Sequence, residues 1–405
     1  MVLDDGSFGR ACAPSGASTG RYEAWELRDG EPEHYWGLGV RTAVANVNGE
    51  IARALVRADA RDQALVDRLM LELDGSLSLN RLGANAVLAV SMAVARAAAA
   101  QRDMPLYRYI AELAGTTPSM PMPMTNILSG GAHAGRGMDL QDFLVVPVGA
   151  QSYSEALEVI SRVRTAAAAI MQAQALTTLL ADEGGLSPGF ARADQALDLM
   201  MRSFDAAGLR AGADVAIALD VAASELFEDG RYVLKGEGKR LDGLEMVAFI
   251  TGLARRFPII SIEDGLDQDD WDNWREITRQ LPNVQIVGDD LFVTNAERIE
   301  LGIGRGVANA ALIKLNQNGT LTGTLSAISI CKSANYATVV SARSGETEDT
   351  FIADLAVGAG AGQIKIGSVR NSERLAKYNQ LLRIEEEASA PFAGMSGVRA
   401  GSAEP

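Results

Sequence analysis

Short apolar runs, each ending in a polar residue, recur through the second half of the chain. Val215–Leu219 is one such run and Ile259–Ile262 is another, and each is followed by a stretch with helical spacing of its apolar residues. The polar residues that close six runs of this kind are Asp220, Glu263, Asp289, Lys314, Arg343 and Lys365. Strands that alternate with helices predict βα units and a parallel sheet. Six consecutive units predict a barrel, in which the carboxyl ends of the strands share one mouth.

The first part of the chain has a different pattern. Phe8–Cys12 is a candidate strand after an Asp-Asp-Gly turn, and Pro14–Gly20 is a loop because its residues are small and flexible. Helical periodicity marks residues 41–56, 60–73 and 82–101. We therefore predict a small α+β domain over residues 1–118, a barrel domain over residues 119–396 and a flexible tail over residues 397–405.

The most apolar run of the chain is Leu82–Ala100. Asn85, Ser91 and Arg96 interrupt it, and alanine and glycine dilute it. This composition predicts a buried core helix rather than a membrane span.

Charge and cysteine content narrow the class of protein further. The net charge of −15 argues against nucleic acid and anionic membranes as partners. Cys12 and Cys331 form no paired motif, which argues against a disulfide framework and a zinc site and fits a reducing cytosol. Met1 is followed by Val-Leu-Asp-Asp-Gly, which does not resemble a secretory signal. We therefore expect a cytoplasmic protein.

Three of the strand-end residues are carboxylates, namely Asp220, Glu263 and Asp289. Carboxylates that converge on one mouth repel one another strongly unless a cation lies between them. Oxygen ligands with a partly open shell suit Mg²⁺. A single strand-end carboxylate is more often a cap or a surface residue, but three in register, each after an apolar strand, favour a metal site.

The other three strand-end residues, Lys314, Arg343 and Lys365, are cations. A lysine near bound metal ions can have a lowered pKa and act as a base, and an arginine fork suits phosphate or carboxylate. Solvated surface charge is the usual role of such residues. It is less favoured here because the chain has only six lysines against 31 arginines, and two of the six stand at strand ends.

Two flexible loops carry further candidates. Ala181–Gly185 lies between two predicted helices, and its paired glycines would let the backbone place Glu183 tightly. His133 lies in a glycine-rich loop and is one of only two histidines. Taken alone, an interhelical turn and an incidental loop histidine are the favoured interpretations of these segments.

Eight longer motifs occur in a fixed order along the chain. They are Pro14-Ser-Gly-Ala-Ser-Thr-Gly, Gly130-Gly-Ala-His-Ala, Asp182-Glu-Gly-Gly, Ser261-Ile-Glu-Asp, Asp289-Asp-Leu-Phe-Val-Thr-Asn, Ile313-Lys-Leu-Asn-Gln, Arg343-Ser-Gly-Glu-Thr-Glu-Asp-Thr and Arg374-Leu-Ala-Lys-Tyr-Asn-Gln-Leu-Leu-Arg-Ile-Glu-Glu-Glu. Together they resemble the enolase family, from about Leu3 to about Gly394. The resemblance implies an α/β fold, an enolase-type (β/α)8 barrel of order ββαα(βα)6 behind a smaller α+β domain. It also implies dehydration of 2-phosphoglycerate to phosphoenolpyruvate.

The resemblance implies a role for each candidate residue and two Mg²⁺ ions per active site. Asp220, Glu263 and Asp289 match the ligands of the first ion, and Ser18 matches a ligand of the second. The other matches are Lys314 as the base, Glu183 as the group that helps to protonate the leaving hydroxyl, Lys365 as the carboxylate-binding lysine, Arg343 and Ser344 as phosphate contacts, and His133 and Asp142 as further substrate contacts.

Several positions near the expected site depart from the family's pattern. Ala342 replaces the histidine that precedes the arginine of the Arg-Ser-Gly-Glu-Thr motif, and Asp142 replaces a longer acid. Further departures are Ser129, Gly265, Asn318 and Ile366, and most of the small domain's first strand is missing. The matched metal ligands and the base are retained, whereas positions near the expected substrate phosphate are altered. This combination suggests a paralogue with a modified substrate.

Three functions remain open at this point. The chain is an enolase, or an enolase paralogue that forms carboxyphosphonoenolpyruvate in phosphonate antibiotic biosynthesis, or a non-catalytic binding protein on the same scaffold. The third is least favoured because every matched metal ligand and the base are present. The expected partner is a small phosphorylated carboxylate. A weakened homodimer is also expected, because Arg383 matches an arginine that pairs with an acid in the missing segment.

Overall fold

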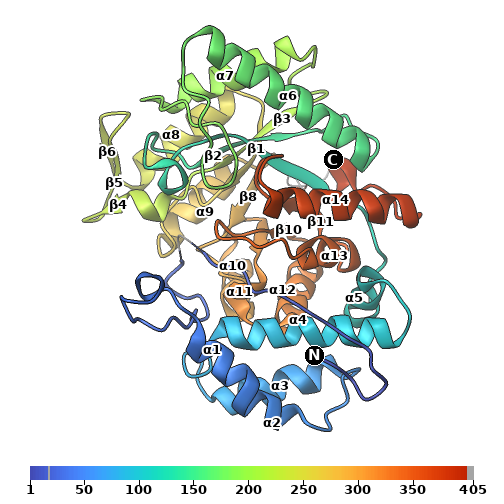
Figure 1. The fold of residues 1–405 in the computed structure, drawn as a ribbon. Coiled ribbons are helices and arrows are strands. Elements are labelled where there is room, and N and C mark those ends of the chain that lie inside the picture. Colours follow the sequence, from blue (N-terminus) through green and yellow to red (C-terminus); the bar gives the residue numbers. More distant parts are fainter. Residues whose placement is uncertain (17–18, 399–405) are drawn as a thin grey trace.

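Eight strands form a closed barrel (Figure 1) in the computed structural model, which describes residues 1–16 and 19–398. The strands are β1 (Met122–Ser129), β2 (Asp142–Val146), β3 (Ala216–Asp220), β7 (Ile259–Glu263), β8 (Gln285–Gly288), β9 (Ala310–Ile313), β10 (Ala337–Ser341) and β11 (Gly362–Lys365). Their order around the barrel is β1-β11-β10-β9-β8-β7-β3-β2. Only β2 runs antiparallel to its neighbours, so all the other strands end at the same mouth.

Helices follow the strands in chain order and cover the outside of the barrel (Figure 1). They are α6 (Tyr153–Ala173), α7 (Ala193–Ala206), α8 (Gly243–Arg256), α9 (Trp271–Gln280), α10 (Ala296–Arg305), α12 (Leu321–Ser333), α13 (Phe351–Gly358) and α14 (Ser372–Glu387). The four-residue helix α11 (Leu315–Asn318) instead follows β9 at the mouth, where it contacts α4. Because α6 and α7 both follow β2, the order is ββαα(βα)6, which confirms the predicted fold class. A small antiparallel sheet, β4 (Phe227–Glu228), β5 (Arg231–Leu234) and β6 (Lys239–Leu241), is inserted between β3 and α8.

Local sequence signals explain where several helices begin. At α8, the Asp242 carboxylate accepts a hydrogen bond from the Glu245 backbone N–H (2.9 Å), and the Glu245 carboxylate accepts one from the Asp242 N–H (2.8 Å). This capping box satisfies two backbone donors that the helix itself leaves unpaired. At α10 the cap is a single bond, from the Arg298 N–H to the Asn295 side chain (3.0 Å).

The residues before β1 form a helical layer beside the barrel (Figure 1). It contains α1 (Arg41–Asn46), α2 (Ala52–Leu55), α3 (Gln63–Asp74), α4 (Ala84–Gln101) and α5 (Leu106–Ala114), with a π-helical turn between α1 and α2. The three predicted helical stretches are therefore confirmed. α4 contacts α11 and α12, and α5 packs against α13, so this layer is joined directly to barrel helices.

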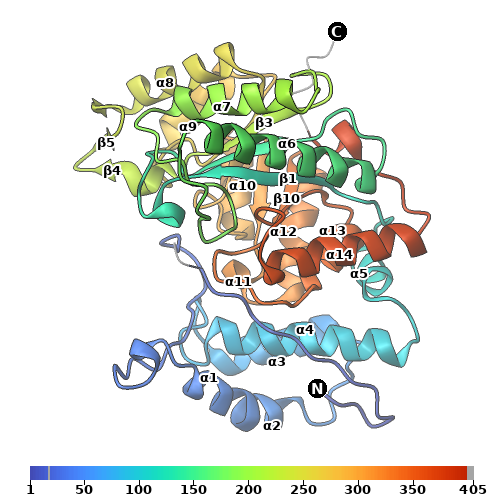
Figure 2. The same ribbon diagram turned by 45° about the horizontal axis from the view of Figure 1, so that its top comes forward.

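The N-terminal segment runs across α4 toward the barrel (Figure 2). Gly9 permits this close approach, since a Cβ at that position would lie 2.0 Å from the Ala93 carbonyl oxygen. The strand predicted at Phe8–Cys12 is wrong, because Phe8 alone forms a bridge there, with Val2. The backbone of this segment bonds to side chains instead: Arg96 donates to the Arg10 carbonyl (2.5 Å).

Helix α4 is the one helix in the described part of the chain that is long and apolar enough to cross a membrane. Its most apolar window is 72% buried within the protein, and it packs between α3 and the barrel helices α11 and α12. The expectation of a buried core helix is confirmed.

Candidate active site

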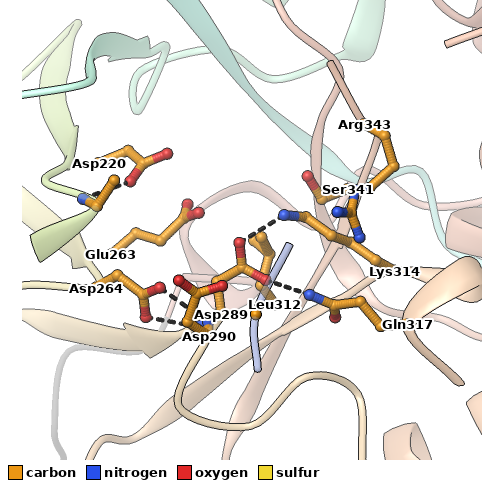
Figure 3. A network of polar contacts seen from close by, with 12 residues as sticks. Asp220, Glu263, Asp264, Asp289, Asp290, Leu312, Lys314, Gln317, Ser341 and Arg343 are labelled. Atoms are coloured by element: carbon orange, nitrogen blue, oxygen red, sulfur yellow. Dashed lines mark hydrogen bonds and ion pairs between the residues drawn. The ribbon is translucent and has the colours of Figure 1, made fainter. Parts of the chain in front are cut away.

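Asp220, Glu263 and Asp289 lie side by side at the barrel mouth (Figure 3). Asp220 ends β3, Glu263 ends β7 and is its partner in register, and Asp289 directly follows β8. All three are buried. Figure 3 shows them on one side of the mouth, with Lys314 and Arg343 on the other. The convergence predicted from the strand pattern is therefore present.

The buried carboxylates of this cluster need positive charge nearby in order to stay ionised. Burial raises the pKa of Glu263 well above its ordinary value, and the neighbouring Asp220 raises it further. The Lys365 ammonium lies 2.7 Å from Asp220 Oδ2 and 2.7 Å from Glu263 Oε2. Burial lowers the pKa of Lys365, but the surrounding carboxylates, Asp220 and Glu263 foremost, outweigh burial together and raise it well above its ordinary value. Lys365 is therefore a fixed cation and a suitable partner for a carboxylate.

Lys314 occupies the next part of the mouth. Its Nζ lies 2.5 Å from Asp289 Oδ2, and the Gln317 side chain donates to the other Asp289 oxygen (2.8 Å). Burial lowers the pKa of Lys314, but the carboxylates around it, Asp289 foremost and then Glu263 and Glu23, together leave its pKa above the ordinary value. The protonation of Lys314 thus depends on what else Asp289 binds.

Asp264 and Asp290 also belong to the site, although the sequence pattern did not single them out. One oxygen from each of Asp264, Asp289 and Asp290 lies within 4.8 Å of the others. Both Asp264 oxygens accept backbone hydrogen bonds, from the N–H of Asp289 and that of Asp290 (2.8 Å each). Asp264 is therefore a positioning residue that holds the end of β8. The acid doublets Glu263-Asp264 and Asp289-Asp290 were the signal that could have identified it.

The residues present fit a divalent cation. Buried carboxylate oxygens are hard donors, and Glu263 is not readily ionised without nearby positive charge. Asp264 is less suited as a ligand, because both of its oxygens already accept N–H groups. Asp220, Glu263 and Asp289 therefore stay the predicted ligands. Ser18, the ligand predicted for a second ion, lies outside the described residues.

Arg343 is buried and held by an acid from the small helical layer. Its guanidinium donates to both Glu23 oxygens (2.9 and 3.3 Å) and to the Asn316 side chain (3.2 Å). Glu23 Oε1 also accepts the Gly20 N–H (2.9 Å), which ties the end of the Pro14–Gly20 loop to the mouth. The sequence pattern did not reveal Glu23, whose only signal was its place three residues after that loop.

Glu183 is held inside the mouth by the glycines that follow it. Its carboxylate accepts a hydrogen bond from Asn126 Nδ2 (3.2 Å), and its backbone carbonyl accepts the Ser368 N–H (2.8 Å). Gly184 has φ +85°, and a Cβ at Gly185 would lie 2.2 Å from Ser129 Oγ. The prediction that these glycines place Glu183 tightly is confirmed.

The remaining predicted residues lie around the same mouth. Asp142 at the start of β2 is the register partner of Asp220, and it accepts a hydrogen bond from Ser129 Oγ (2.5 Å). Ser344 follows Arg343 on the loop after β10. His133 lies on η3 (Ala132–Ala134), a short turn between β1 and β2.

Two family models cover nearly the whole chain. The enolase N-terminal domain matches residues 1–110, and the enolase C-terminal TIM barrel domain matches residues 117–400. The chain belongs to the enolase family. Membership supports an enolase-type lyase, and enolases generally use Mg²⁺. The domain boundary at residue 118 and the individual residue roles stay predictions.

Ala342, where the family has a histidine, is buried beside Lys365. Its N–H donates to the Lys365 carbonyl (2.9 Å). A cavity of about 520 Å³ opens next to the same loop, lined among others by Gly16, Arg28, Ser344 and Gly345. The cavity thus adjoins Ser344, one of the two predicted phosphate contacts.

Proposed function

We propose that this protein is a Mg²⁺-dependent lyase that acts on 2-phosphoglycerate or a close analogue. It removes the proton next to the substrate carboxylate, expels the β-substituent and forms a phosphoenolpyruvate-type product. The observation that carries the proposal is the pairing of two lysines with the strand-end carboxylates, Lys365 with Asp220 and Glu263 and Lys314 with Asp289.

Each of these residues has a distinct task in the reaction. Lys365 binds the substrate carboxylate and faces the second negative charge that develops on it. Neutral Lys314 takes the α-proton on its Nζ. The bond between the β-carbon and the leaving hydroxyl then breaks, and Glu183 assists by giving that hydroxyl a proton. Arg343 and Ser344 hold the phosphate, for which the guanidinium fork is suited.

Asp220, Glu263 and Asp289 would hold the catalytic Mg²⁺. When bound, the ion supplies positive charge that stabilises the doubly charged carboxylate and lowers the pKa of Lys314. The chain's own contribution is the geometry of these ligands. Asp264 fixes the backbone at Asp289, and Gln317 fixes the direction of the Asp289 side chain.

A second candidate is an enolase paralogue that forms carboxyphosphonoenolpyruvate. The 520 Å³ cavity beside Ser344 and the absence of an imidazole at Ala342 favour it. A substrate whose phosphorus carries a further carboxylate-bearing group would need such space, and Arg343 could serve the additional anion. Activity on both substrates, compared as kcat/KM, separates the two candidates.

Lys314→Ala tests the proposed chemistry. We expect the variant to lose exchange of the substrate α-proton with solvent while it still binds Mg²⁺, because the base is removed and the carboxylates remain. Exchange is measured by NMR in deuterated buffer and Mg²⁺ binding by calorimetry. Lys235→Ala, at an exposed lysine on the insertion between β3 and α8, is the matched control and should exchange normally.

Two outcomes would contradict the proposal. Exchange retained in Lys314→Ala would remove Lys314 from its role as base. Wild-type protein that binds Mg²⁺ but exchanges no α-proton from either substrate would instead indicate a non-catalytic binding protein.

A further inference from the structure

An arginine without a counterion is buried on the outside of the barrel, away from the mouth. Arg164 lies on α6 and is only 5% exposed. Its Nε has no hydrogen-bond partner, and no ion pair of Arg164 occurs within residues 1–16 and 19–398. A buried guanidinium that lacks an anionic or carbonyl partner is costly, and proteins rarely keep one.

This arginine faces a cavity with a second arginine in its wall. The cavity has a volume of about 270 Å³ and lies where α6, α14 and the loop after β11 meet; its polar lining includes Arg164, Arg370, Ser161, Thr165 and Asn379. α6 and α14 pack side by side here (Figure 1). Among the described residues no acid lines the cavity, although the chain as a whole carries a net charge of −15.

The lowered pKa of Arg164 is consistent with a buried guanidinium that lacks an anionic partner. Burial lowers the pKa of Arg164, and the positive charge of Arg370 lowers it further. Arginine nonetheless stays protonated at neutral pH, so the two charges persist and repel each other. An anion between them would offset the repulsion and supply the negative partner that the Arg164 guanidinium lacks.

We propose that Arg164 and Arg370 bind a small phosphate-bearing metabolite in this cavity. Two guanidinium groups match the several acceptor oxygens of a phosphate, and the hydroxyls of Ser161 and Thr165 supply further donors. Leu157 and Val369 form an apolar wall against which the organic part of a phosphate ester packs.

The site adjoins a loop that reaches the catalytic mouth. A Cβ at Gly184, next to Glu183, would lie 3.0 Å from Arg370 Cβ. Tyr378, which also lines the cavity, donates to the Gly367 carbonyl (2.7 Å). The bound anion would therefore contact the loop that supports the backbone of Glu183.

Thermal unfolding with inorganic phosphate as the probe tests the proposal in Arg164→Met. Without phosphate, the variant should melt about 2 °C or more above wild type, because methionine fills the space without an unpaired charge. Adding phosphate should raise the Tm of wild type by more than that of the variant, since a ligand stabilises only the form that binds it. Phosphate bound at the catalytic mouth contributes equally to both and cancels. Arg162→Met, at an arginine of α6 that does not line the cavity, should behave as wild type.

Calorimetry gives an independent measurement. We expect a class of phosphate sites in wild type that weakens at least about tenfold in both Arg164→Met and Arg370→Met. Equal phosphate binding in wild type and the two variants would overturn the proposal. So would a variant that is less stable than wild type without phosphate, because Arg164 would then be a structural residue. Chloride at matched ionic strength must not reproduce the phosphate effect.

Discussion

Lys314 and Lys365 share one barrel mouth, but they are surrounded by different numbers of carboxylates. Among the residues that the structure describes, Lys365 donates to two, Asp220 and Glu263, whereas Lys314 donates to Asp289 alone. The pKa of Lys365 is accordingly raised well above its ordinary value despite burial, and that of Lys314 is raised less. The lysine whose pKa is raised less gives up its proton more readily, which explains how two similar residues can serve as a base and as a fixed charge.

Ala342→His tests whether the site lacks a contact to the phosphate of 2-phosphoglycerate. If the natural substrate carries a larger group on phosphorus, the variant should turn over 2-phosphoglycerate more efficiently, because an imidazole donor restores a polar contact. Such a contact contributes about 1–3 kcal/mol to transition-state binding, or roughly 5- to 150-fold in kcat/KM. Ala342→Leu, which adds bulk without a donor, is the control and should show no gain. A wild-type kcat/KM equal to that of a housekeeping enolase would contradict the idea.

Helix α14 shows how an element supports the site without entering it. Arg374 and Lys377, one turn apart, are both fully buried. Arg374 donates to the carbonyls of Arg343 (2.6 Å), Ser344 (2.7 Å) and Ile366 (3.1 Å). Lys377 pairs with Glu346 (2.9 Å) on the same loop after β10. Two buried charges therefore hold the loop that carries the predicted phosphate contacts.

Arg374→Met should destabilise the protein and loosen this loop. Three carbonyls lose a donor whose side chain is fully buried, which we expect to lower the free energy of unfolding by about 3–5 kcal/mol. KM for a phosphorylated substrate should rise more than kcat falls, because the phosphate contacts move while Lys314 does not. Denaturant unfolding and steady-state kinetics measure the two effects. Arg279→Met, at an exposed arginine of α9, is the control, and an unchanged KM in Arg374→Met would argue against the positioning role.

At the scale of the whole molecule, the small helical layer and the barrel are joined by polar contacts. Arg96 on α4 makes two hydrogen bonds to Asp349 (2.8 and 2.7 Å), and the Cys12 N–H donates to the same carboxylate (2.8 Å). Glu23 also forms an ion pair with Arg343 inside the mouth. The layer therefore helps to build the site, since it supplies the acid that holds Arg343.

Asp354, on α13 near α14, should make the stability of the molecule depend on pH. Burial raises its pKa from 3.8 to about 7, although Arg96 and Gln380 oppose this change. The folded protein therefore binds more protons than the unfolded chain between these pH values, so stability falls as pH rises from about 4 to about 7 and then levels off.

Asp354→Asn should remove this pH dependence. A carboxyl pKa raised from 3.8 to about 7 by folding costs at most about 4 kcal/mol once the group is ionised, so the variant should be more stable than wild type at pH 8 and similar to it near pH 4. Denaturant unfolding across this pH range measures the difference. Asp205→Asn, at an exposed position on α7, should follow wild type at every pH. A constant difference between Asp354→Asn and wild type would show that Asp354 does not titrate in this range.

The strand-end residues could be found from sequence because their signal is local. An apolar run that ends in Asp220 or Lys365 predicts a buried strand, and parallel strands in a barrel must end at one mouth. The glycines after Glu183 were informative for the same reason. Glycine is the residue that adopts positive φ and allows close backbone approach without strain, so its presence indicates such a conformation. The resemblance to the enolase family came from motifs such as that at Pro14–Gly20, whose residues are contiguous.

The tertiary structure alone decided which distant residues support that mouth. Glu23 meets Arg343 across 320 positions of the chain, and no local pattern distinguishes it from a surface acid. The same holds for Arg374 and Lys377, which resemble exposed helix residues until α14 packs against the barrel. The extended course of the first residues was also mispredicted, because their backbone bonds to Arg96 and Asp349 replace a neighbouring strand. Such contacts depend on how elements pack against one another, and the sequence of a single element does not specify that packing.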